Sequence, residues 1–397
     1  MTIRVVYVSH NEIDNGLVRS QVLPYLRGLA ERDVEVRLLT YERDGSSFPE
    51  GEFPRDRWTA LRARRGTGLL AKAIDVAAGV VAVLRLVARH RADLVHARSY
   101  VPAAIALAVR ILRGRPYVFD MRGFLPEEYV DVGYWTTGDV RYRVARLAER
   151  VLLAGAGGIV CPSTDAERRL RSAPEYRSAT RAKPITVQPS MVDLDRFRPR
   201  PERAAVPTLV YSGSLGTWYM LDEMLAVYAR ARDLVPALRL LIVTRSDPAI
   251  VRDAVRRAHL EDTAITSRPA GYSEMPGLLG SSHVAIALVR QARSKLGASA
   301  LKVAEYLACG LPVVLNAGLG DADGLVARYE AGHVVPSYAE PDLDRAAKAI
   351  ADLLHDEQAR ANARRLAEEH FDLAVGVERY RALYAQILGV ASGIMAR

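Results

Sequence analysis

Three side chains of different chemistry, Ser299, Lys302 and Glu305, recur at three-residue spacing within the segment 295–316. The segment predicts a glycine-containing loop, a helix over 299–308 that Ser299 caps or opens, and then a buried strand. Residues three apart share one side of a helix, so the hydroxyl, the ammonium and the carboxylate would line up at its amino end. That row suits a phosphate beside a polyol, although a solvated polar face is the alternative for three such residues alone.

The string that follows, AEYLACGLPVV, resembles the donor-binding element of retaining GT-B glycosyltransferases of family 4. The resemblance implies that Glu305 contacts the ribose of a nucleotide sugar and that Lys302 lies near its diphosphate. The family often has a second Glu eight residues earlier, where this chain has Gly297, and SALKVAEYLACGLPVV is similar to members that lack it. We expect the backbone amides of Gly297, Ala298 and Ser299 to take the place of that carboxylate at the transferred sugar.

Strand and helix patterns alternate along nearly the whole chain, which predicts an α/β fold of parallel sheets covered by helices. Two series of strands are expected, at 3–9, 34–40, 94–97, 117–119, 158–161 and 185–188, and then at 209–212, 239–243, 283–287, 312–315 and 333–335. Helices are expected between them at 17–31, 69–89, 103–112, 141–154, 165–171, 221–233, 248–258, 299–308 and 343–354.

The segment 196–207 contains three prolines and four arginines and is the predicted linker. It separates two Rossmann-like domains, 1–195 on the acceptor side and 208–370 for the nucleotide-sugar donor. This is the GT-B plan that the resemblance implies. In that plan the active site lies in the interdomain cleft, and a C-terminal helix, here about 371–390, crosses back onto the first domain.

Polar residues follow two predicted strands of the first domain, at the strand ends where open α/β sheets bind ligands. Asp-Leu-Val-His-Ala-Arg-Ser over 93–99 resembles the family's "D-VH" motif, which places His96, Arg98 and Ser99 at the cleft. Phe-Asp-Met-Arg-Gly over 119–123 resembles the "D-RG" of a bacterial subset, with Asp120 and Arg122 near the position of a sugar-contacting His in other members. We expect Asp120, Arg122 and His96 to be catalytic and Arg98 and Ser99 to lie on the acceptor side. A structural histidine and an internal Asp120–Arg122 ion pair are the alternatives.

The loop after the first predicted strand lacks a GxGxxG fingerprint, which argues against a nicotinamide-dependent enzyme. In the family this loop carries glycines that let the acceptor and the donor phosphate approach a helix. Here Gly16 is the only glycine of the loop, and Ser20 follows in the first helical turn. Both are expected on the acceptor side, with an ordinary helix cap as the alternative.

The second domain opens with Leu-Val-Tyr-Ser-Gly-Ser-Leu-Gly over 209–216 and a helix expected near Trp218. Gly213 and Gly216 permit close approach of a phosphate to the backbone. Relatives often have an Arg at Ser214 and a following Lys, so the cationic role falls to Lys302 here. Lys295 and Arg290 are the alternative candidates for this cationic role. Arg245 lies where relatives bind the nucleotide base.

Composition limits the class of protein. The chain has 397 residues, a formal net charge of +9, and only two cysteines, Cys161 and Cys309. Two cysteines so far apart form neither a disulfide framework nor a zinc site, which favours a reducing cytoplasm. No secretory signal is expected, because the first residues run into a strand. The charge suits a polyanionic ligand or an anionic membrane surface, and without a nucleic-acid motif no nucleic-acid partner is expected.

Five arginines between Arg55 and Arg65 precede the predicted helix 69–89. Lys72, Asp75 and later arginines interrupt the apolar residues of this helix, so the pattern does not predict a membrane span. Two interpretations remain open. Either the segment docks on anionic lipid at the inner face of the membrane, or it is a core helix of the first domain with a basic loop before it.

Together these features predict a retaining glycosyltransferase that uses a nucleotide diphosphate sugar. Its acceptor is not identified by the sequence and belongs to a small-molecule, glycan or lipid-linked class. No cofactor and no metal are expected, because no Asp-x-Asp occurs in a suitable loop and helix dipoles and basic side chains bear the diphosphate charge in the family. A nucleotide-sugar 2-epimerase of the same architecture and a non-catalytic nucleotide-sugar-binding protein are the alternatives.

Overall fold

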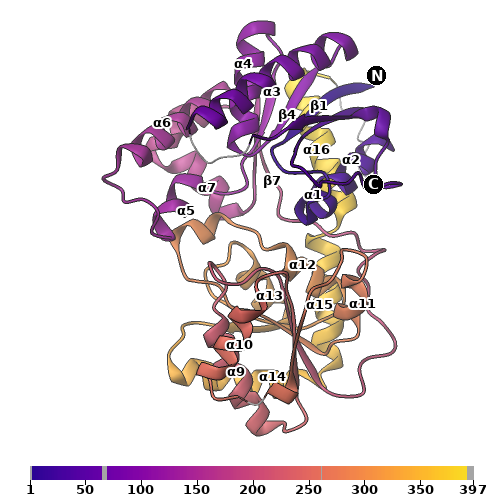
Figure 1. Cartoon of the computed structure of the whole chain (residues 1–397), viewed down its shortest axis with the longest axis vertical. Coiled ribbons are helices and arrows are strands. Elements are labelled where there is room, and N and C mark those ends of the chain that lie inside the picture. The colour runs from indigo at the N-terminus through magenta and orange to yellow at the C-terminus, as the bar shows by residue number, and fades with distance from the viewer. Residues whose placement is uncertain (1, 65–68, 261, 391–397) are drawn as a thin grey trace. The chain divides into compact units, whose positions relative to one another are not determined.

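The computed structural model describes residues 2–64, 69–260 and 262–390. The chain divides into two compact units, of which unit 1 comprises Met1–Pro189 and Leu373–Arg397 and unit 2 comprises Ser190–Asp372. Each unit contains one parallel sheet covered by helices (Figure 1), so the predicted α/β class with two Rossmann-like domains is confirmed.

Among the described residues, unit 1 has a seven-stranded parallel sheet in the order β3-β2-β1-β4-β5-β6-β7. Its strands are β1 Ile3–Ser9, β2 Val34–Glu42, β3 Trp58–Arg62, β4 Leu94–Arg98, β5 Tyr117–Asp120, β6 Gly158–Cys161 and β7 Ile185–Val187. Every residue of β4, β5 and β6 is buried, as expected for strands covered on both faces. The carboxyl ends of these strands present the polar residues discussed below.

The helices of unit 1 cover both faces of this sheet. They are α1 Gly16–Gln21, α2 Leu23–Ala30, α3 Leu69–His90, α4 Tyr100–Arg113, α5 Leu125–Asp131, α6 Val140–Gly155, α7 Thr164–Ser172, α8 Pro174–Thr180 and α16 Leu373–Leu388, with a 3₁₀ turn η1 Arg55–Arg57. The single helix predicted over 17–31 is two helices, because Val22 leaves helical geometry just before Pro24, which lacks an N–H group.

Among the described residues, unit 2 has a six-stranded parallel sheet in the order β10-β9-β8-β11-β12-β13. Its strands are β8 Thr208–Ser212, β9 Arg239–Val243, β10 Ile265–Arg268, β11 Val284–Ala287, β12 Val313–Asn316 and β13 Gly332–Val335. Its helices are α9 Leu221–Leu234, α10 Pro248–Arg257, α11 Met275–Gly280, α12 Leu301–Ala308, α13 Ala322–Tyr329, α14 Glu340–Leu353 and α15 Glu357–His370, with 3₁₀ turns η2 Asp262–Ala264 and η3 Arg293–Gly297.

The basic segment before α3 contains the edge strand β3. Arg55 pairs with Glu50, Arg62 pairs with Asp44, and Arg65 lies outside the described residues. The helix α3 contributes buried residues such as Val83 to the core of unit 1, which favours the core-helix interpretation. Within the described part of the chain, no helix has the length and apolar character needed to cross a bilayer.

The segment 196–207 packs on unit 2. Atoms of Pro199 lie close to Gly310, the side chain of Arg200 lies against Gly280, and the Ala204 amide donates to the Ser281 carbonyl over 2.9 Å. The division between the units falls at Pro189, six residues before the predicted end of the first domain.

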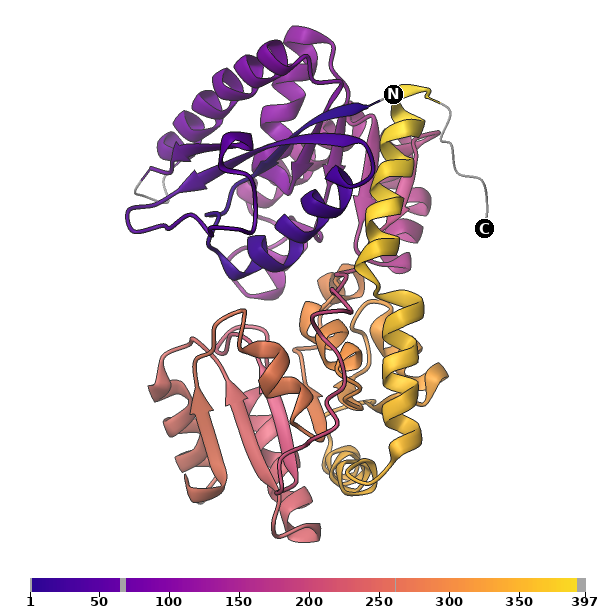
Figure 2. The same ribbon diagram turned by 90° about the vertical axis from the view of Figure 1, so that its right-hand side faces the viewer.

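The C-terminal helix α16 follows unit 2 in the chain but belongs to unit 1. It packs beside α2 (Figures 1 and 2). Two glycines make room for it, because added Cβ atoms at Gly28 and Gly158 would approach the side chains of α16 residues. At Gly158 that atom would lie 2.7 Å from Ile387 Cδ1 and 2.9 Å from Leu383 Cδ1. An alanine at this position would therefore force the ends of the Ile387 and Leu383 side chains to move.

The variant Gly158→Ala should destabilise unit 1 by about 1–3 kcal/mol, because the added methyl group overpacks the contact with α16. Gly138→Ala is the matched control, since the nearest atom to its added Cβ is Thr136 Oγ1 at 3.8 Å. Urea unfolding followed by tryptophan fluorescence measures both. Equal midpoints for the two variants would contradict the packing described for α16.

Candidate donor site and polar cluster

The loop after β8 brings the backbone of unit 2 to the side chain of Lys302. Gly213 and Gly216 have φ values of +131° and +96°, which favour glycine. A side chain at Gly213 would collide with Nζ of Lys302. Gly213 and Lys302 are 89 positions apart in the sequence, and the structure places them in contact as two parts of one predicted donor site.

Lys302 is buried among aromatic rings. Its Nζ donates to the Tyr211 hydroxyl over 3.1 Å and lies 3.1 Å from the centroid of the Tyr219 ring. The Tyr211 hydroxyl in turn donates to the carbonyl of Ser214 over 2.6 Å. Burial lowers the pKa of Lys302 well below its ordinary value, and the charge of Glu305 only partly opposes this. No carboxylate within the described residues forms an ion pair with this ammonium, so an anionic ligand would supply the missing counter-charge.

Glu305 lies one turn along α12 from Lys302 and is also buried. Burial raises the pKa of Glu305 to about 7, although Lys302 and Arg196 draw it down. Arg196 stacks over the Tyr272 ring at 3.9 Å. The site therefore contains a carboxyl group whose protonation state changes near neutral pH and whose oxygen atoms suit hydroxyl donors.

A tyrosine that sequence reasoning missed fixes α12 against the glycine loop. The Tyr306 hydroxyl accepts the backbone N–H of Ser212 over 2.6 Å and is 3.0 Å from the Ser212 Oγ. Ser212 immediately precedes Gly213, so this contact sets the position of the loop relative to Lys302. In the sequence, Tyr306 shows only an apolar helix position, which gives no sign of this bond.

The expected cap at Ser299 is wrong. The helix α12 begins at Leu301 with Ala300 as its N-cap, and no side chain caps it. Ser299 instead accepts the Ser190 N–H on its Oγ over 2.8 Å, and its carbonyl accepts from Ser190 Oγ over 3.1 Å. The hydroxyl therefore ties the segment after β7 to the start of α12.

One of the backbone amides expected to replace the missing Glu already donates a hydrogen bond within the protein. The Ala298 N–H donates to the Lys295 carbonyl over 3.1 Å, so this amide already has a partner. Gly297 is buried at the end of η3. Of the three amides predicted at the transferred sugar, the one at Ala298 is therefore engaged within the protein in this structure.

The helix expected near Trp218 begins three residues later, at Leu221. The residues before it form a loop whose Trp218 ring lies 3.6 Å from Nζ of Lys295. The Arg290 N–H donates to the Trp218 carbonyl over 2.7 Å. Lys295 and Arg290, the alternative cations, thus contact the loop that also carries Tyr219, and neither occupies the buried position of Lys302.

Arg245 is exposed after β9 and donates to the Ala270 carbonyl over 3.3 Å. The neighbouring Ser246 Oγ accepts the Leu215 N–H over 2.8 Å, which joins this loop to the glycine loop. In unit 2 the structure therefore brings together the predicted positions Gly213, Ser214, Lys302 and Glu305, and it connects the Arg245 loop to them through the Leu215 amide.

In unit 1, Asp120 ends β5 within a buried polar cluster. Its carboxylate is 3.2 Å from Arg98 Nη1, 3.4 Å from Arg122 Nη1 and 3.5 Å from His96 Nε2. Burial acts to raise the pKa of Asp120, but the Arg122 charge and the His96 hydrogen bond hold it well below its usual range. Asp120 and His96 have no exposed surface, whereas the Arg122 side chain is 19% exposed. The structure thus brings together the three residues predicted to be catalytic, and Arg122 is the one that solvent reaches.

Two tyrosines of α16 complete this cluster, and the sequence analysis missed both. The Tyr380 hydroxyl donates to Asp120 Oδ2 over 3.2 Å, and the Tyr384 hydroxyl lies 2.8 Å from His96 Nδ1. Burial lowers the pKa of His96, although the hydrogen bond and charge of Asp120 oppose this. A weak signal existed, because two tyrosines at a spacing of four lie on one face of the predicted C-terminal helix.

Of the residues predicted on the acceptor side, Arg98 is buried at the end of β4 in this cluster, and Ser99, Gly16 and Ser20 lie at the starts of two helices. Ser99 precedes α4 with a φ of +75°, which is uncommon for a residue other than glycine, and its N–H donates to the Asp120 carbonyl over 2.8 Å. Gly16 is exposed at the start of α1, with no atom near its added Cβ. Ser20 is buried, and its hydroxyl donates to the Gly16 carbonyl of the same helix over 2.7 Å, so the hydroxyl proton already has an acceptor within α1. A strained backbone conformation such as the positive φ of Ser99 is often found at functional sites.

Residues 2–64, 69–260 and 262–390 contain no group of three or more His, Cys, Asp or Glu side chains placed to hold a metal ion. Among the residues predicted at the donor site, Lys302 and Glu305 are the two with buried ionisable side chains.

Solved structures with the same fold cover nearly the whole chain. Sucrose-phosphate synthase from Thermosynechococcus elongatus superimposes with a TM-score of 0.74 at 18% identity, covering 98% of this chain and 99% of that one. Anabaena HepE in complex with UDP and glucose gives 0.71 at 13% identity, covering 97% and 100%. A putative UDP-N-acetylglucosamine 2-epimerase from Listeria monocytogenes gives 0.63 at 12% identity, covering 97% and 96%. At these identities the likeness shows the fold alone.

The sequence matches two family models in succession, one for each half of the chain. Residues 18–187 match the family described as Glycosyl transferase 4-like domain, and residues 195–370 match Glycosyl transferases group 1. No curated protein matches the chain significantly. Because the two matches together span most of the sequence, the chain belongs to the GT-B glycosyltransferases of the family 4 type.

Proposed function

We propose that this protein transfers a sugar from a nucleotide diphosphate sugar, with retention of configuration and without a metal ion. The observation that carries the proposal is the buried ammonium of Lys302 beside the backbone of Gly213, with Glu305 one turn away. A buried cation without an ion-pair partner among the described residues is unfavourable unless a ligand compensates it. The Anabaena relative solved with UDP and glucose is consistent with a diphosphate in that role.

In this mechanism Lys302 meets the diphosphate and Glu305 accepts hydrogen bonds from the ribose. The barrier falls chiefly because the ammonium stabilises the charge that develops on the departing diphosphate. The leaving phosphate then helps to deprotonate the acceptor hydroxyl on the same face of the sugar, which retains the configuration. Lys302 thereby supplies the positive charge that a divalent cation supplies in metal-dependent transferases.

Arg122 is proposed as the group of unit 1 that reaches substrate, and Asp120 and His96 as the residues that position it. This differs from the prediction that all three are catalytic, because Asp120 and His96 are enclosed by β4, β5 and α16. The Asp120 carboxylate holds the Arg122 guanidinium at 3.4 Å, and the Gln188 carbonyl accepts from the same nitrogen over 3.3 Å.

Two alternatives stay open. A nucleotide-sugar 2-epimerase shares the fold, but its chemistry needs acid–base groups at the sugar, and this chain has Gly297 where relatives have a Glu. A non-catalytic binder would keep the Lys302 and Glu305 contacts without turnover. Both alternatives predict nucleotide binding, so binding alone does not separate them from a transferase.

Incubation with a panel of labelled nucleotide sugars, with and without EDTA, separates the three functions. We expect slow hydrolysis or transfer of one donor and an unchanged rate in EDTA, because Lys302 bears the diphosphate charge. Formation of an epimer would identify the 2-epimerase, and binding without turnover would identify the non-catalytic protein. Loss of activity on chelation with recovery in Mg²⁺ or Mn²⁺ would contradict the metal-independent mechanism.

Two substitutions should separate the phosphate contact from the ribose contact. Lys302→Met keeps the length of the side chain without its charge, so it should weaken UDP, GDP or ADP binding by about 1.5–3 kcal/mol and leave nucleoside binding unchanged. Glu305→Gln should weaken nucleotide and nucleoside equally. Isothermal titration calorimetry measures both, and a Lys302→Met variant that loses nucleoside affinity to the same extent would make Lys302 a structural residue.

A second pair of variants separates turnover from stability in unit 1. Arg122→Gln should lower kcat at unchanged donor affinity, because its contact forms in the reactive complex. Tyr380→Phe removes only the hydrogen bond to Asp120, so it should reduce stability by about 0.5–1.5 kcal/mol and lower kcat much less than Arg122→Gln does. Steady-state kinetics and urea unfolding decide this. Normal turnover in Arg122→Gln would show that Arg122 belongs only to an internal ion pair.

A further inference from the structure

Four large apolar side chains form an exposed stripe along α6. Val140, Val144, Leu147 and Val151 are 72%, 59%, 55% and 48% exposed. Their spacing of four, three and four residues places them within about 60° of arc on a helix of 3.6 residues per turn. Single exposed apolar residues are ordinary on protein surfaces, but a continuous row on one helix face marks an interaction surface.

The opposite side of α6 anchors the helix in unit 1. Leu152 and Leu153 are buried there, and so is Glu149. The Glu149 carboxylate accepts from the Tyr176 hydroxyl over 2.6 Å and from Arg146 over 2.7 Å. The outward direction of the apolar stripe is therefore fixed by buried contacts on the other face.

Arginines flank the stripe on both sides. Arg141 lies on one side, and Arg143 and Arg150 lie on the other, all three exposed. Arg141 is 3.8 Å from Asp139 at the N-cap. The single acidic residue of α6 is Glu149, which is on the buried face. The outward face of the helix thus combines apolar groups with cations, which is the pattern of a helix that lies in a lipid interface.

The neighbouring helix α4 continues this pattern. It packs beside α6 in the same layer as α3 (Figure 1), and an added Cβ at Gly155 would approach Leu107. The last turn of α4 exposes Ile111 and Leu112 among the arginines Arg110, Arg113 and Arg115, and α4 contains no acidic residue. The exposed Tyr134 precedes α6 and is of a residue type that favours the membrane interface.

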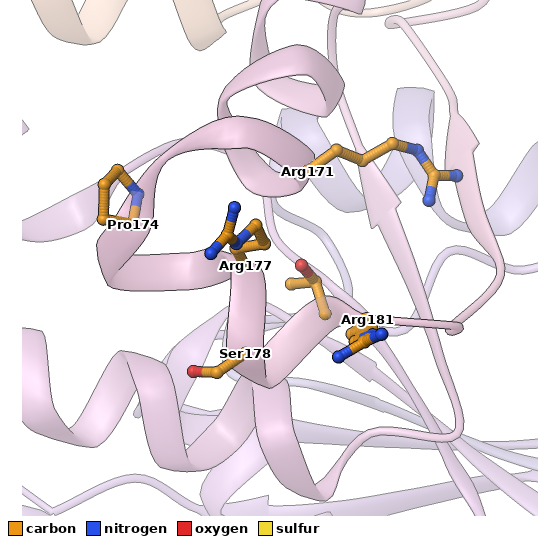
Figure 3. Close-up of a pocket in the computed structure, with 6 residues that line it drawn as sticks. Arg171, Pro174, Arg177, Ser178 and Arg181 are labelled. Atoms are coloured by element: carbon orange, nitrogen blue, oxygen red, sulfur yellow. The ribbon is translucent and has the colours of Figure 1, made fainter.

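A pocket lined by arginines lies between residues of α7 and α8. The helix α8 also packs against α6. Arg171, Arg177 and Arg181 line a pocket of about 710 Å³ there, together with Pro174, Ser178 and Thr180 (Figure 3). Arg171 pairs with Glu167 over 2.8 Å, whereas the guanidinium groups of Arg177 and Arg181 have no ion pair or hydrogen bond among the described residues. This pocket adds cationic groups next to the helix that carries the apolar stripe.

We propose that the outer face of α6, with the last turn of α4, lies on an anionic lipid surface. A second copy of the chain is the less favoured occupant, because a symmetric contact would set these arginines against each other without compensating carboxylates. An anionic bilayer accepts both components, since the valine and leucine side chains enter the acyl boundary and the long arginine side chains reach the headgroups. This surface differs from the predicted docking segment before α3, and the proposal does not rest on the proposed sugar transfer.

The test is vesicle co-sedimentation of the full chain. The wild type should bind mixed phosphatidylcholine and phosphatidylglycerol vesicles, bind phosphatidylcholine alone weakly, and dissociate as salt is raised. The double variant Val144→Glu/Leu147→Glu should bind the mixed vesicles at least about tenfold more weakly, equivalent to 1.4 kcal/mol. Leu234→Glu is the matched control, because Leu234 is 57% exposed on α9 of unit 2.

Thermal unfolding confirms that the variants fold. Sedimentation velocity without lipid tests the second-copy alternative. Absence of binding of the wild type to anionic vesicles would overturn the proposal. Binding of the double variant with the affinity of the wild type would also overturn it. A wild-type dimer that the double variant loses, without any lipid binding, would assign the stripe to self-association instead.

Discussion

The arrangement of unit 2 depends on one unfavourable feature, an ammonium group buried without an ion-pair partner among the described residues. Lys302 can approach the backbone at Gly213 only because that residue has no side chain. The Tyr211 hydroxyl accepts from the ammonium, and the Tyr219 ring presents its face to it. These contacts offset part of the desolvation, and the remainder favours a ligand that carries negative charge. This is the physical basis of the proposal that Lys302 contacts the diphosphate of the donor.

The charges buried in unit 1 show the opposite arrangement. Asp120 is compensated by two arginines and holds a tyrosine hydroxyl from α16, so its cluster needs no ligand for its stability. Breaking one partner of such a cluster would leave an uncompensated buried charge, so its loss should destabilise unit 1. The two units therefore differ, because the buried Asp120 is compensated by arginines of its own unit, whereas Lys302 has no ion-pair partner among the described residues.

Sequence reasoning predicted the buried strands well, because continuous apolar runs bounded by turn residues identify them. It missed the edge strands β3 and β10, where exposed positions and arginines interrupt that pattern. The partnership of Gly213 with Lys302 was predictable from a family resemblance, whereas the capping role of Ser299 failed because Ser190, distant in sequence, binds its hydroxyl. Propensity describes local preference, and contacts between distant segments override it.

The apolar stripe of α6 could not be recognised from the sequence for a related reason. Large apolar side chains occur on both sides of that helix, and the burial of Glu149, Leu152 and Leu153 in the structure shows which side faces the interior. The same limit applies to Tyr380 and Tyr384, whose hydroxyl partners lie on strands more than 250 residues earlier. Residue type and periodicity predict that a helix has a buried face, but they do not identify the residues that this face contacts.

The protonation of Lys302 tests the central claim most directly. The chain has five lysines, so NMR of an isotopically lysine-labelled sample resolves each amine, with Lys302→Met to assign its signal. In the free protein the pKa of Lys302 should lie well below those of the other lysines. Saturation with the nucleoside diphosphate that binds should raise it, because the phosphate favours the charged form, so that binding takes up a proton at a pH between the two values. An ordinary pKa that the nucleotide leaves unchanged would contradict the account of this site.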